Sequence, residues 1–127
     1  MRLAYKIWID NKGKAFGDGP FELLNWVKKT RSLHQAANQM GMSYSKAWRL
    51  IRDLEKRLGF ILIERKVGGY MGGGSTITVE AKRLMKLYDR FRREVREVLP
   101  HIYEKHFNSF FQETHKLGKE KRERRGN

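Results

Sequence analysis

The stretch SLHQAANQMGMSYSKAWRLIRDLEKRL, residues 32–58, decides the fold. It predicts two helices joined by a tight turn. Ser32 followed three residues later by Gln35 has the spacing of a capping box at a helix start, and Gly41 suits the left-handed backbone that ends a helix. Ser43 is a good cap for the second helix, and Gly59 is a natural end for it. The apolar residues of that helix repeat with a period near 3.6: Ala47, Leu50, Ile51, Leu54 and Leu58.

Small residues occupy the positions where these two helices would cross closely, namely Ala37, Gly41 and Ala47. This arrangement is typical of a helix-turn-helix. The outer face of the second helix mixes cations, hydroxyls and aromatic rings, which suit contacts with phosphates and base edges: Tyr44, Ser45, Lys46, Trp48, Arg49 and Arg52. An ordinary helical hairpin with a solvated basic face would share this pattern, but the flanking segments favour a helix-turn-helix.

Composition indicates a small basic protein with a polyanionic partner. The 127 residues include 28 Lys and Arg against 14 Asp and Glu, so the formal net charge is +14. That excess favours DNA, RNA or an anionic membrane surface. No stretch approaches the roughly 20 apolar residues of a membrane span, and no signal peptide opens the chain. With no cysteine for disulfides or zinc, we expect a cytoplasmic protein that has no membrane partner.

The N-terminal residues predict a strand, a turn and a further helix. Leu3, Tyr5, Ile7 and Ile9 alternate with other residues, which indicates a strand with one buried face. After a turn over residues 11–14, residues 15–16 are expected to pair back as a hairpin. A helix is predicted from Pro20, a residue favoured at the first helical position, to about residue 31. It would complete a three-helix core.

The segment after Gly59 predicts a wing, which is a hairpin beside the recognition helix. A strand is expected over residues 60–65, because the segment is short and rich in β-branched and aromatic residues, and a return strand over residues 75–77. Between them lie Gly68, Gly69, Gly72, Gly73 and Gly74, too many glycines to pack a core. A P-loop would need a lysine after the last glycine, and a dinucleotide site would need a βαβ unit. We therefore expect no cofactor, although the loop amides could form an anion-binding nest.

Thr78 is predicted to cap a long helix over residues 79–99, with apolar residues at steps of three and four. Part of that stripe should pack on the domain and the rest should meet a second copy of the chain. The proposed dimer contacts are Leu84, Tyr88, Phe91, Val95 and Val98. The alternative is a helix that folds wholly onto its own domain.

Pro100 is expected to end the long helix and to allow a short accessory helix over residues 100–115. Its aromatic residues need a cover: the first strand, the long helix or a partner subunit. His101, His106 and His115 do not share one helical face, so we expect no metal site. Residues 116–127 are basic without an apolar pattern, which predicts a disordered tail. Residues 1–78 would then be the winged DNA-binding domain, and the fold class is mainly α with a small β component.

With these elements in place, the chain resembles the N-terminal DNA-binding domain of ModE-type molybdate-responsive regulators, which is itself similar to LysR-type domains. The resemblance covers about residues 20–98. Four segments carry it: SYSKAW at 43–48, ERKVGG at 64–69, GGG at 72–74 and LMKLY at 84–88.

The resemblance implies a homodimer that binds an operator through paired recognition helices and wings. Under it, Ser43 and the outer face of the recognition helix would meet DNA, and Arg65, Lys66 and the wing glycines would contact the backbone. Full-length regulators of this family also carry a C-terminal module that binds oxyanions. Only 28 residues follow Leu99 (127 − 99), so we expect this chain to lack that module and to bind no small molecule, molybdate and tungstate included.

The function expected from the sequence is therefore a dimeric, sequence-specific, DNA-binding transcription regulator. Residues 43–58 would enter the major groove, and the wing over residues 65–75 would lie on the adjacent backbone. One alternative is a non-specific architectural protein that binds nucleic acid by charge. Another is a winged-helix module that binds a protein and works with a separate effector-sensing subunit. No catalytic constellation is evident, so we do not expect an enzyme.

Overall fold

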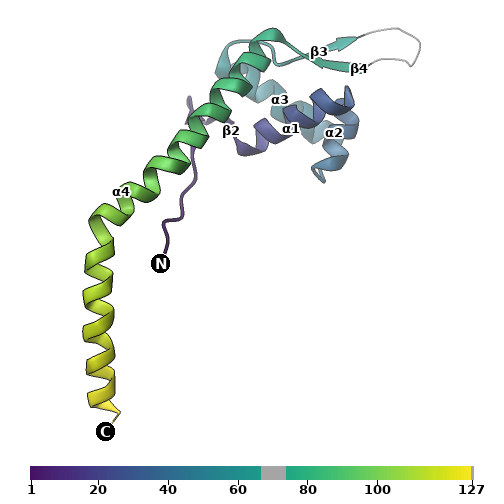
Figure 1. Ribbon diagram of the computed structural model, residues 1–127. Helices are drawn as coiled ribbons and strands as arrows, with labels where there is room; N and C mark the ends of the chain where they lie inside the picture. The colour runs from purple at the N-terminus through teal and green to yellow at the C-terminus, as the bar shows by residue number, and fades with distance from the viewer. Residues whose placement is uncertain (67–73, 127) are drawn as a thin grey trace. The chain divides into compact units, whose positions relative to one another are not determined.

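The computed structural model describes residues 1–66 and 74–126 and is mainly helical, with two small antiparallel hairpins (Figure 1). This confirms the predicted fold class, a winged helix-turn-helix with a long C-terminal helix. The helices are α1 (Asp18–Thr30), α2 (Leu33–Gln39), α3 (Tyr44–Leu58) and α4 (Val79–Arg125). The strands are β1 (Trp8–Asp10), β2 (Lys14–Gly17), β3 (Ile63–Lys66) and β4 (Gly74–Ile77).

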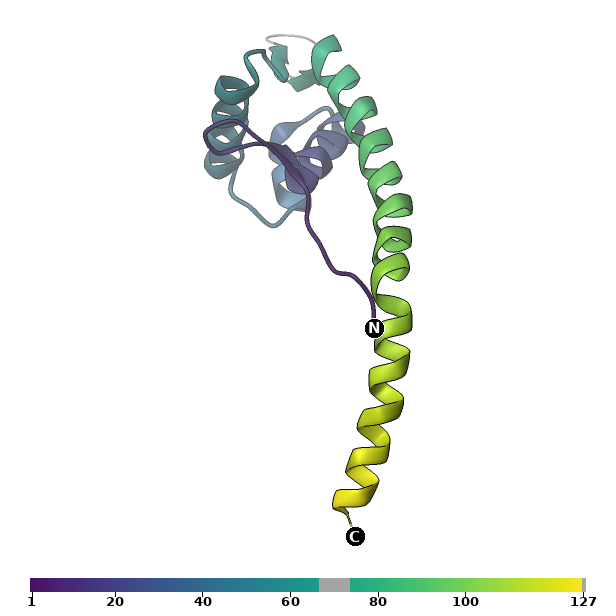
Figure 2. The same ribbon diagram turned by 90° about the vertical axis from the view of Figure 1, so that its left-hand side faces the viewer.

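The chain divides into two compact units, one of residues Lys6–Arg90 and one of Met1–Tyr5 together with Phe91–Asn127. In the first unit, α1 and α2 lie between α3 and the first turns of α4 (Figure 2). All four helices contribute to one apolar core, which includes Phe16, Leu24, Leu33, Ile51 and Tyr88. This core holds α3 from behind, so that its outer face remains open to solvent.

Side-chain and glycine caps set the ends of α2 and α3 as predicted. The Ser32 hydroxyl oxygen accepts a hydrogen bond from the Gln35 amide at 3.1 Å, and Ser43 accepts one from the Lys46 amide at 3.1 Å. Gly41 and Gly59 have φ angles of +67° and +87°, where a residue with a Cβ would be strained. Gly41 thus allows the tight turn between α2 and α3, and Gly59 allows the chain to leave the end of α3.

The prediction for the N-terminal segment is wrong in part. The hairpin exists, because β1 pairs with β2 through Ile9 and Phe16. However, β1 begins only at Trp8, and Leu3, Tyr5 and Ile9 are exposed. The physical reason is that β2 packs against the core through Ala15 and Phe16, whereas β1 pairs with β2 alone. An alternating apolar pattern indicates a half-buried strand only when a second layer covers it.

The wing strands pair as predicted, with Ile63 opposite Ile77 and Lys66 opposite Gly74. The first strand starts three residues later than expected, at Ile63. The Thr78 hydroxyl donates a 2.7 Å hydrogen bond to the Ile61 carbonyl and accepts one from the Ala81 amide at 3.1 Å. Thr78 thus caps α4 as predicted and also fixes the entry to β3.

The C-terminal prediction is wrong, because α4 continues through Pro100 to Arg125 as one helix. Proline removes one backbone hydrogen bond and crowds the preceding turn, but the residues on both sides of Pro100 are helical. The segment predicted to be a disordered tail is also helical. Its Lys, Glu and Arg residues have high helix propensity, and pairs such as Glu120 and Arg124 have the i,i+4 spacing that stabilises a helix.

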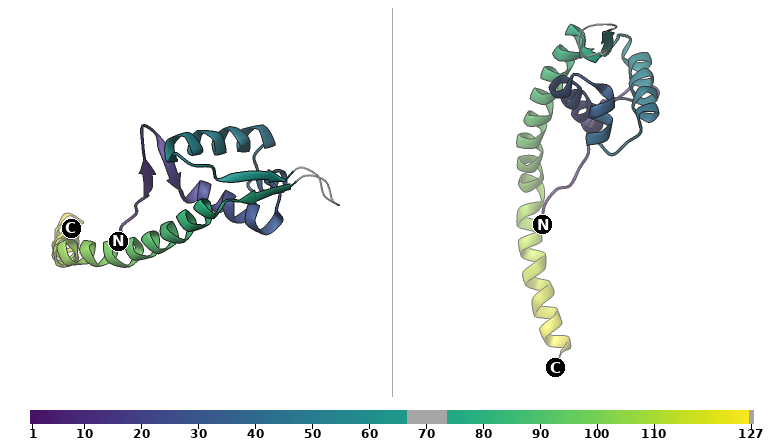
Figure 3. Two further views of the ribbon diagram at one scale, coloured as in Figure 1. Left: turned by 90° about the horizontal axis from the view of Figure 1, so that it is seen from above. Right: turned by 90° about the vertical axis from the view of Figure 1, so that its right-hand side faces the viewer.

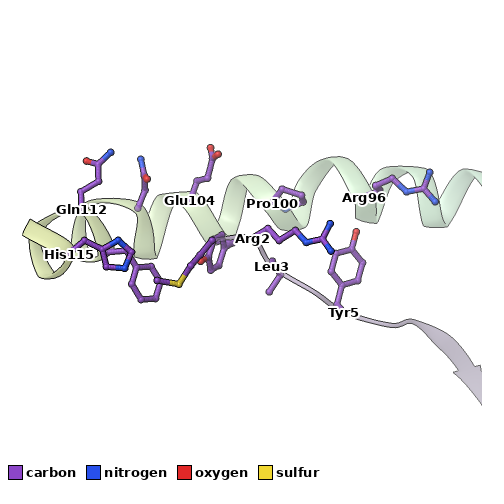
Figure 4. A pocket seen from close by; sticks show the side chains of 12 residues that line it. Arg2, Leu3, Tyr5, Arg96, Pro100, Glu104, Gln112 and His115 are labelled. Atoms are coloured by element: carbon purple, nitrogen blue, oxygen red, sulfur yellow. The ribbon is translucent and has the colours of Figure 1, made fainter. Parts of the chain in front are cut away.

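In the second unit, the N-terminal segment lies against α4 and leaves a hollow of about 500 Å³ (Figure 4). Its lining includes Arg2, Tyr5, Arg96, Tyr103 and Phe111. The first residues thus provide part of the cover that the aromatic patch was expected to need. Phe107 and Phe110 nevertheless remain about half exposed, so the unit keeps an apolar surface within the residues that the structure describes.

Candidate nucleic-acid interface

The helix α3 separates a buried face from an exposed, cationic face. Ala47, Ile51 and Leu54 are fully buried, which fixes the rotation of the helix. The opposite face is exposed and holds most of the residues predicted to bind DNA: Ser43, Tyr44, Ser45, Lys46, Arg49 and Arg52. The N-terminal half of α3 therefore exposes the hydroxyl and cationic side chains that were predicted from the sequence to face DNA.

Trp48 differs from the other predicted contacts, because it is only partly exposed and packs against the core. Two guanidinium groups lie over its ring, that of Arg65 at 4.7 Å and that of Arg52 at 5.8 Å from Cζ to the ring centroid. Both distances are within the range of cation–π attraction. The ring of Tyr44 approaches it in a T-shaped arrangement at 6.3 Å. The indole thus lies beneath the cationic surface.

Arg65 connects the wing with the recognition helix. Besides its contact with Trp48, its Nη2 donates a 2.9 Å hydrogen bond to the Tyr44 hydroxyl. The ring of His34 also lies near Tyr44, at 5.6 Å between centroids. His34 was not among the residues predicted from the sequence to bind DNA. The i,i+4 spacing of Tyr44, Trp48 and Arg52 was the available signal for a row of side chains on α3.

Two further sets of contacts hold the hairpin, one from α3 and one from the end of α1 (Figure 3). Oε2 of Glu55 accepts hydrogen bonds from the amides of Leu62 at 2.7 Å and Ile63 at 3.4 Å. The Arg31 carbonyl accepts one from the Ser75 amide at 2.9 Å. The hairpin is therefore fixed at both strands.

Of the predicted wing contacts, Arg65 and Lys66 are exposed on β3. Gly74 lies at the start of β4, where a Cβ would come within 3.0 Å of the Arg31 carbonyl oxygen. Its lack of a side chain therefore allows close packing of β4 on the end of α1. Gly68, Gly69, Gly72 and Gly73 lie outside the described residues.

The dimer contacts predicted on α4 do not share one environment. Tyr88 is 2% exposed and packs against Phe16 and Phe21, so the prediction that this side chain meets a partner is wrong. Leu84 is partly buried against the same core. By contrast, Phe91 is 51% and Val98 is 46% exposed, and Val95 is partly exposed. The heptad pattern of α4 did not show which of its apolar residues pack on the domain's own core and which remain exposed.

Within residues 1–66 and 74–126, none of the helices is long and apolar enough to cross a membrane. The same residues hold no cluster of three or more His, Cys, Asp or Glu that could bind a metal ion. The exposed cations of α3 and β3 therefore form the candidate site.

The cap residues, the crossing of α2 and α3 and the adjacent hairpin define a winged helix-turn-helix domain. Residues 20–81 match the model of the bacterial regulatory helix-turn-helix proteins of the lysR family, and they form a LysR-type helix-turn-helix domain. The chain is also similar to the transcriptional regulator ModE of Yersinia pestis, with 42% identity over 67 residues, which are 53% of this chain and 26% of that protein.

A second relative is the DNA-binding transcriptional dual regulator ModE of Escherichia coli K12. It is 39% identical over 89 residues, which are 70% of this chain and 31% of the relative. The chain thus spans about a quarter to a third of the length of these curated relatives. Among solved structures, ArgP from Mycobacterium tuberculosis superposes with a TM-score of 0.48 at 23% identity, over 67% of this chain and 30% of that one.

Proposed function

We propose that the chain is a DNA-binding transcription regulator that recognises a specific sequence in double-stranded DNA. The observation that carries this proposal is the exposed cationic face of α3, with Arg65 of the wing held against it. Bidentate arginine contacts with guanine and lysine contacts with phosphate are common in such interfaces. The recognition helix would enter the major groove, and the wing would lie on the adjacent backbone.

Electrostatics support DNA as the partner. Within residues 1–66 and 74–126, Lys46, Arg49 and Arg52 have no acidic partner that would neutralise them. Their charges remain available to phosphates, and the net charge of +14 adds a long-range attraction. The relatives named above are transcriptional regulators, and one is named as DNA-binding. The family model that matches residues 20–81 is that of a helix-turn-helix, which is the part that would bind DNA.

The proposed active form is a homodimer held together by α4. Phe91, Val95 and Val98 follow at steps of four and three on a helix whose surface there is substantially exposed. Such spacing is typical of a helix seam. Two recognition helices would then bind half-sites about one helical turn, roughly 34 Å, apart or a multiple of that distance.

The function is tested by selecting bound duplexes from a random-sequence library and measuring affinity for the selected duplex and for a scrambled duplex. The measurement is repeated over a series of salt concentrations. A specific regulator binds the selected duplex about 10³-fold or more tightly than the scrambled one. The selected site should also be two-fold symmetric, because the protein is proposed to be a symmetric dimer.

Two other results would favour a different function. If the affinity is equal for both duplexes and falls steeply with salt, binding depends only on attraction to the phosphates, which favours a non-specific architectural role. Failure to bind any duplex would contradict the proposal and favour a winged helix that binds another protein.

A further inference from the structure

We infer that Trp48 is a positioning residue that holds Arg52 of the recognition helix and Arg65 of the wing in one orientation for binding phosphates or bases. This inference rests on the proposed function and adds a role for a side chain that the resemblance to known regulators would place on the DNA itself. The wing and the recognition helix would then act as a single cationic surface.

The first reason is the packing of the indole. Trp48 contacts the apolar core, and its Nε1 is buried without a hydrogen-bond partner among the described residues. Because it is buried, the Nε1–H group of Trp48 cannot donate a hydrogen bond to DNA in this conformation. The useful part of the side chain is its ring, which is fixed by the core and attracts both guanidinium groups.

The second reason is that Arg65 is held at two points. Its guanidinium lies over Trp48, and one of its amino groups donates to the Tyr44 hydroxyl. An arginine carries five N–H donors, so other donors remain for a ligand. Within the described part of the chain, Arg65 has no acidic partner that would compete. The side chain is thus oriented and still able to bind an anion.

The third reason concerns entropy. A free arginine on a strand at the sheet edge samples many rotamers and loses that freedom when it binds. Trp48 and Tyr44, one turn apart on α3, restrict those rotamers before binding occurs. The benefit should appear as affinity and not as stability, because exposed cation–π contacts contribute little to folding.

The test is a mutant cycle that uses the selected and scrambled duplexes as probes. We expect Trp48→Leu to weaken binding about two- to tenfold in the wild-type chain. The same factor should appear in the Lys46→Ala/Arg49→Ala background, which also lacks two exposed cations but keeps both arginines that lie over Trp48. In the Arg52→Ala/Arg65→Ala background, Trp48→Leu should have little further effect.

The salt dependence supplies a readout that a merely structural role would not change. If Arg65 binds a phosphate, Arg65→Ala should lower the slope of log K against log[salt] by about one. Trp48→Leu should move the slope in the same direction. Trp48→Phe, which keeps an aromatic face, should restore most of the affinity and of the slope.

A second cycle avoids the core altogether, in case Trp48→Leu does not fold. Tyr44 is exposed, so Tyr44→Phe should leave the fold intact and remove only the hydroxyl that Arg65 contacts. It should weaken binding in the wild-type chain and have no effect in Arg65→Ala.

The inference is overturned if Trp48→Leu weakens binding equally in all three backgrounds, or, when that variant does not fold, if Tyr44→Phe acts equally with and without Arg65. In either case wild-type binding still supports the proposed function. If the wild-type chain binds neither duplex, the proposed function fails and this inference fails with it.

Discussion

The hydroxyl of Tyr88 donates a 2.7 Å hydrogen bond to Oδ1 of Asp18, although 70 residues separate the two in the chain. The contact joins the first part of α4 to the start of α1. Around it, the Tyr88 ring packs edge-on against Phe16 at 5.1 Å and lies 5.5 Å from Phe21. One side chain therefore connects α4, the N-terminal hairpin and α1.

Tyr88→Phe should lower the free energy of unfolding by about 1–2 kcal/mol, because it leaves a partly buried carboxylate without one of its donors. The ring packing would remain, so the loss should be smaller than for Tyr88→Ala, about 3–5 kcal/mol. Urea unfolding followed by circular dichroism measures both. Tyr103→Phe is the matched control, because no hydrogen bond of its hydroxyl is found within residues 1–66 and 74–126. Equal effects of the two Phe variants would contradict the assignment.

Glu55 is expected to stabilise the junction between α3 and the wing. Glu55→Ala would leave the Leu62 and Ile63 amides without their acceptor and should cost about 1–3 kcal/mol in unfolding free energy. Glu55→Gln keeps an acceptor oxygen and should cost less. Asp53→Ala, at an exposed position on the same helix, controls for the loss of a negative charge. The idea fails if Asp53→Ala and Glu55→Ala are equally destabilising in a thermal or urea transition.

The helix-turn-helix could be predicted from the sequence because its signals are local. Ser32, Gly41, Ser43 and Gly59 each act on neighbouring backbone atoms, and the apolar stripe of α3 has a helical period. The elements that differ from the prediction depend on residues far away in the sequence. The apolar alternation from Leu3 onward predicted a half-buried strand, but β2 is the strand that packs against the core.

In the candidate site, too, features set by neighbouring residues could be predicted, whereas those set by residues distant in the sequence could not. The exposed residues of α3 follow from its periodicity, so the cationic face could be predicted. The contact between Arg65 and Trp48 could not, because it depends on how a hairpin beyond Gly59 returns to α3. Similarly, a heptad pattern cannot distinguish a side chain such as Tyr88, which packs on its own domain, from one such as Phe91, which remains exposed.

Arg49 is predicted to read a base. It is exposed on α3 and has no cation–π contact or ion pair within the described residues, so its side chain is free to reach the groove. Arg49→Ala should weaken binding to the selected duplex by about 1–3 kcal/mol and change binding to a scrambled duplex much less. Lys56→Ala, in the last turn of the same helix, removes a charge away from the N-terminal end of α3. A uniform loss on both duplexes would assign Arg49 to the phosphate backbone instead.

The dimer seam is predicted to lie on the part of α4 that the core leaves uncovered. Phe91→Glu places a charge where an apolar side chain would meet its copy, and burying an unpaired carboxylate is costly. We expect the variant to be monomeric in sedimentation equilibrium at concentrations where the wild-type chain is dimeric. Leu117→Glu is the matched control, because Leu117 is similarly exposed on the same helix but lies outside residues 79–99. Dissociation by Leu117→Glu alone would move the interface to the C-terminal half of α4. A wild-type chain that stays monomeric, yet protects a two-fold symmetric DNA site, would mean that DNA itself brings the two copies together.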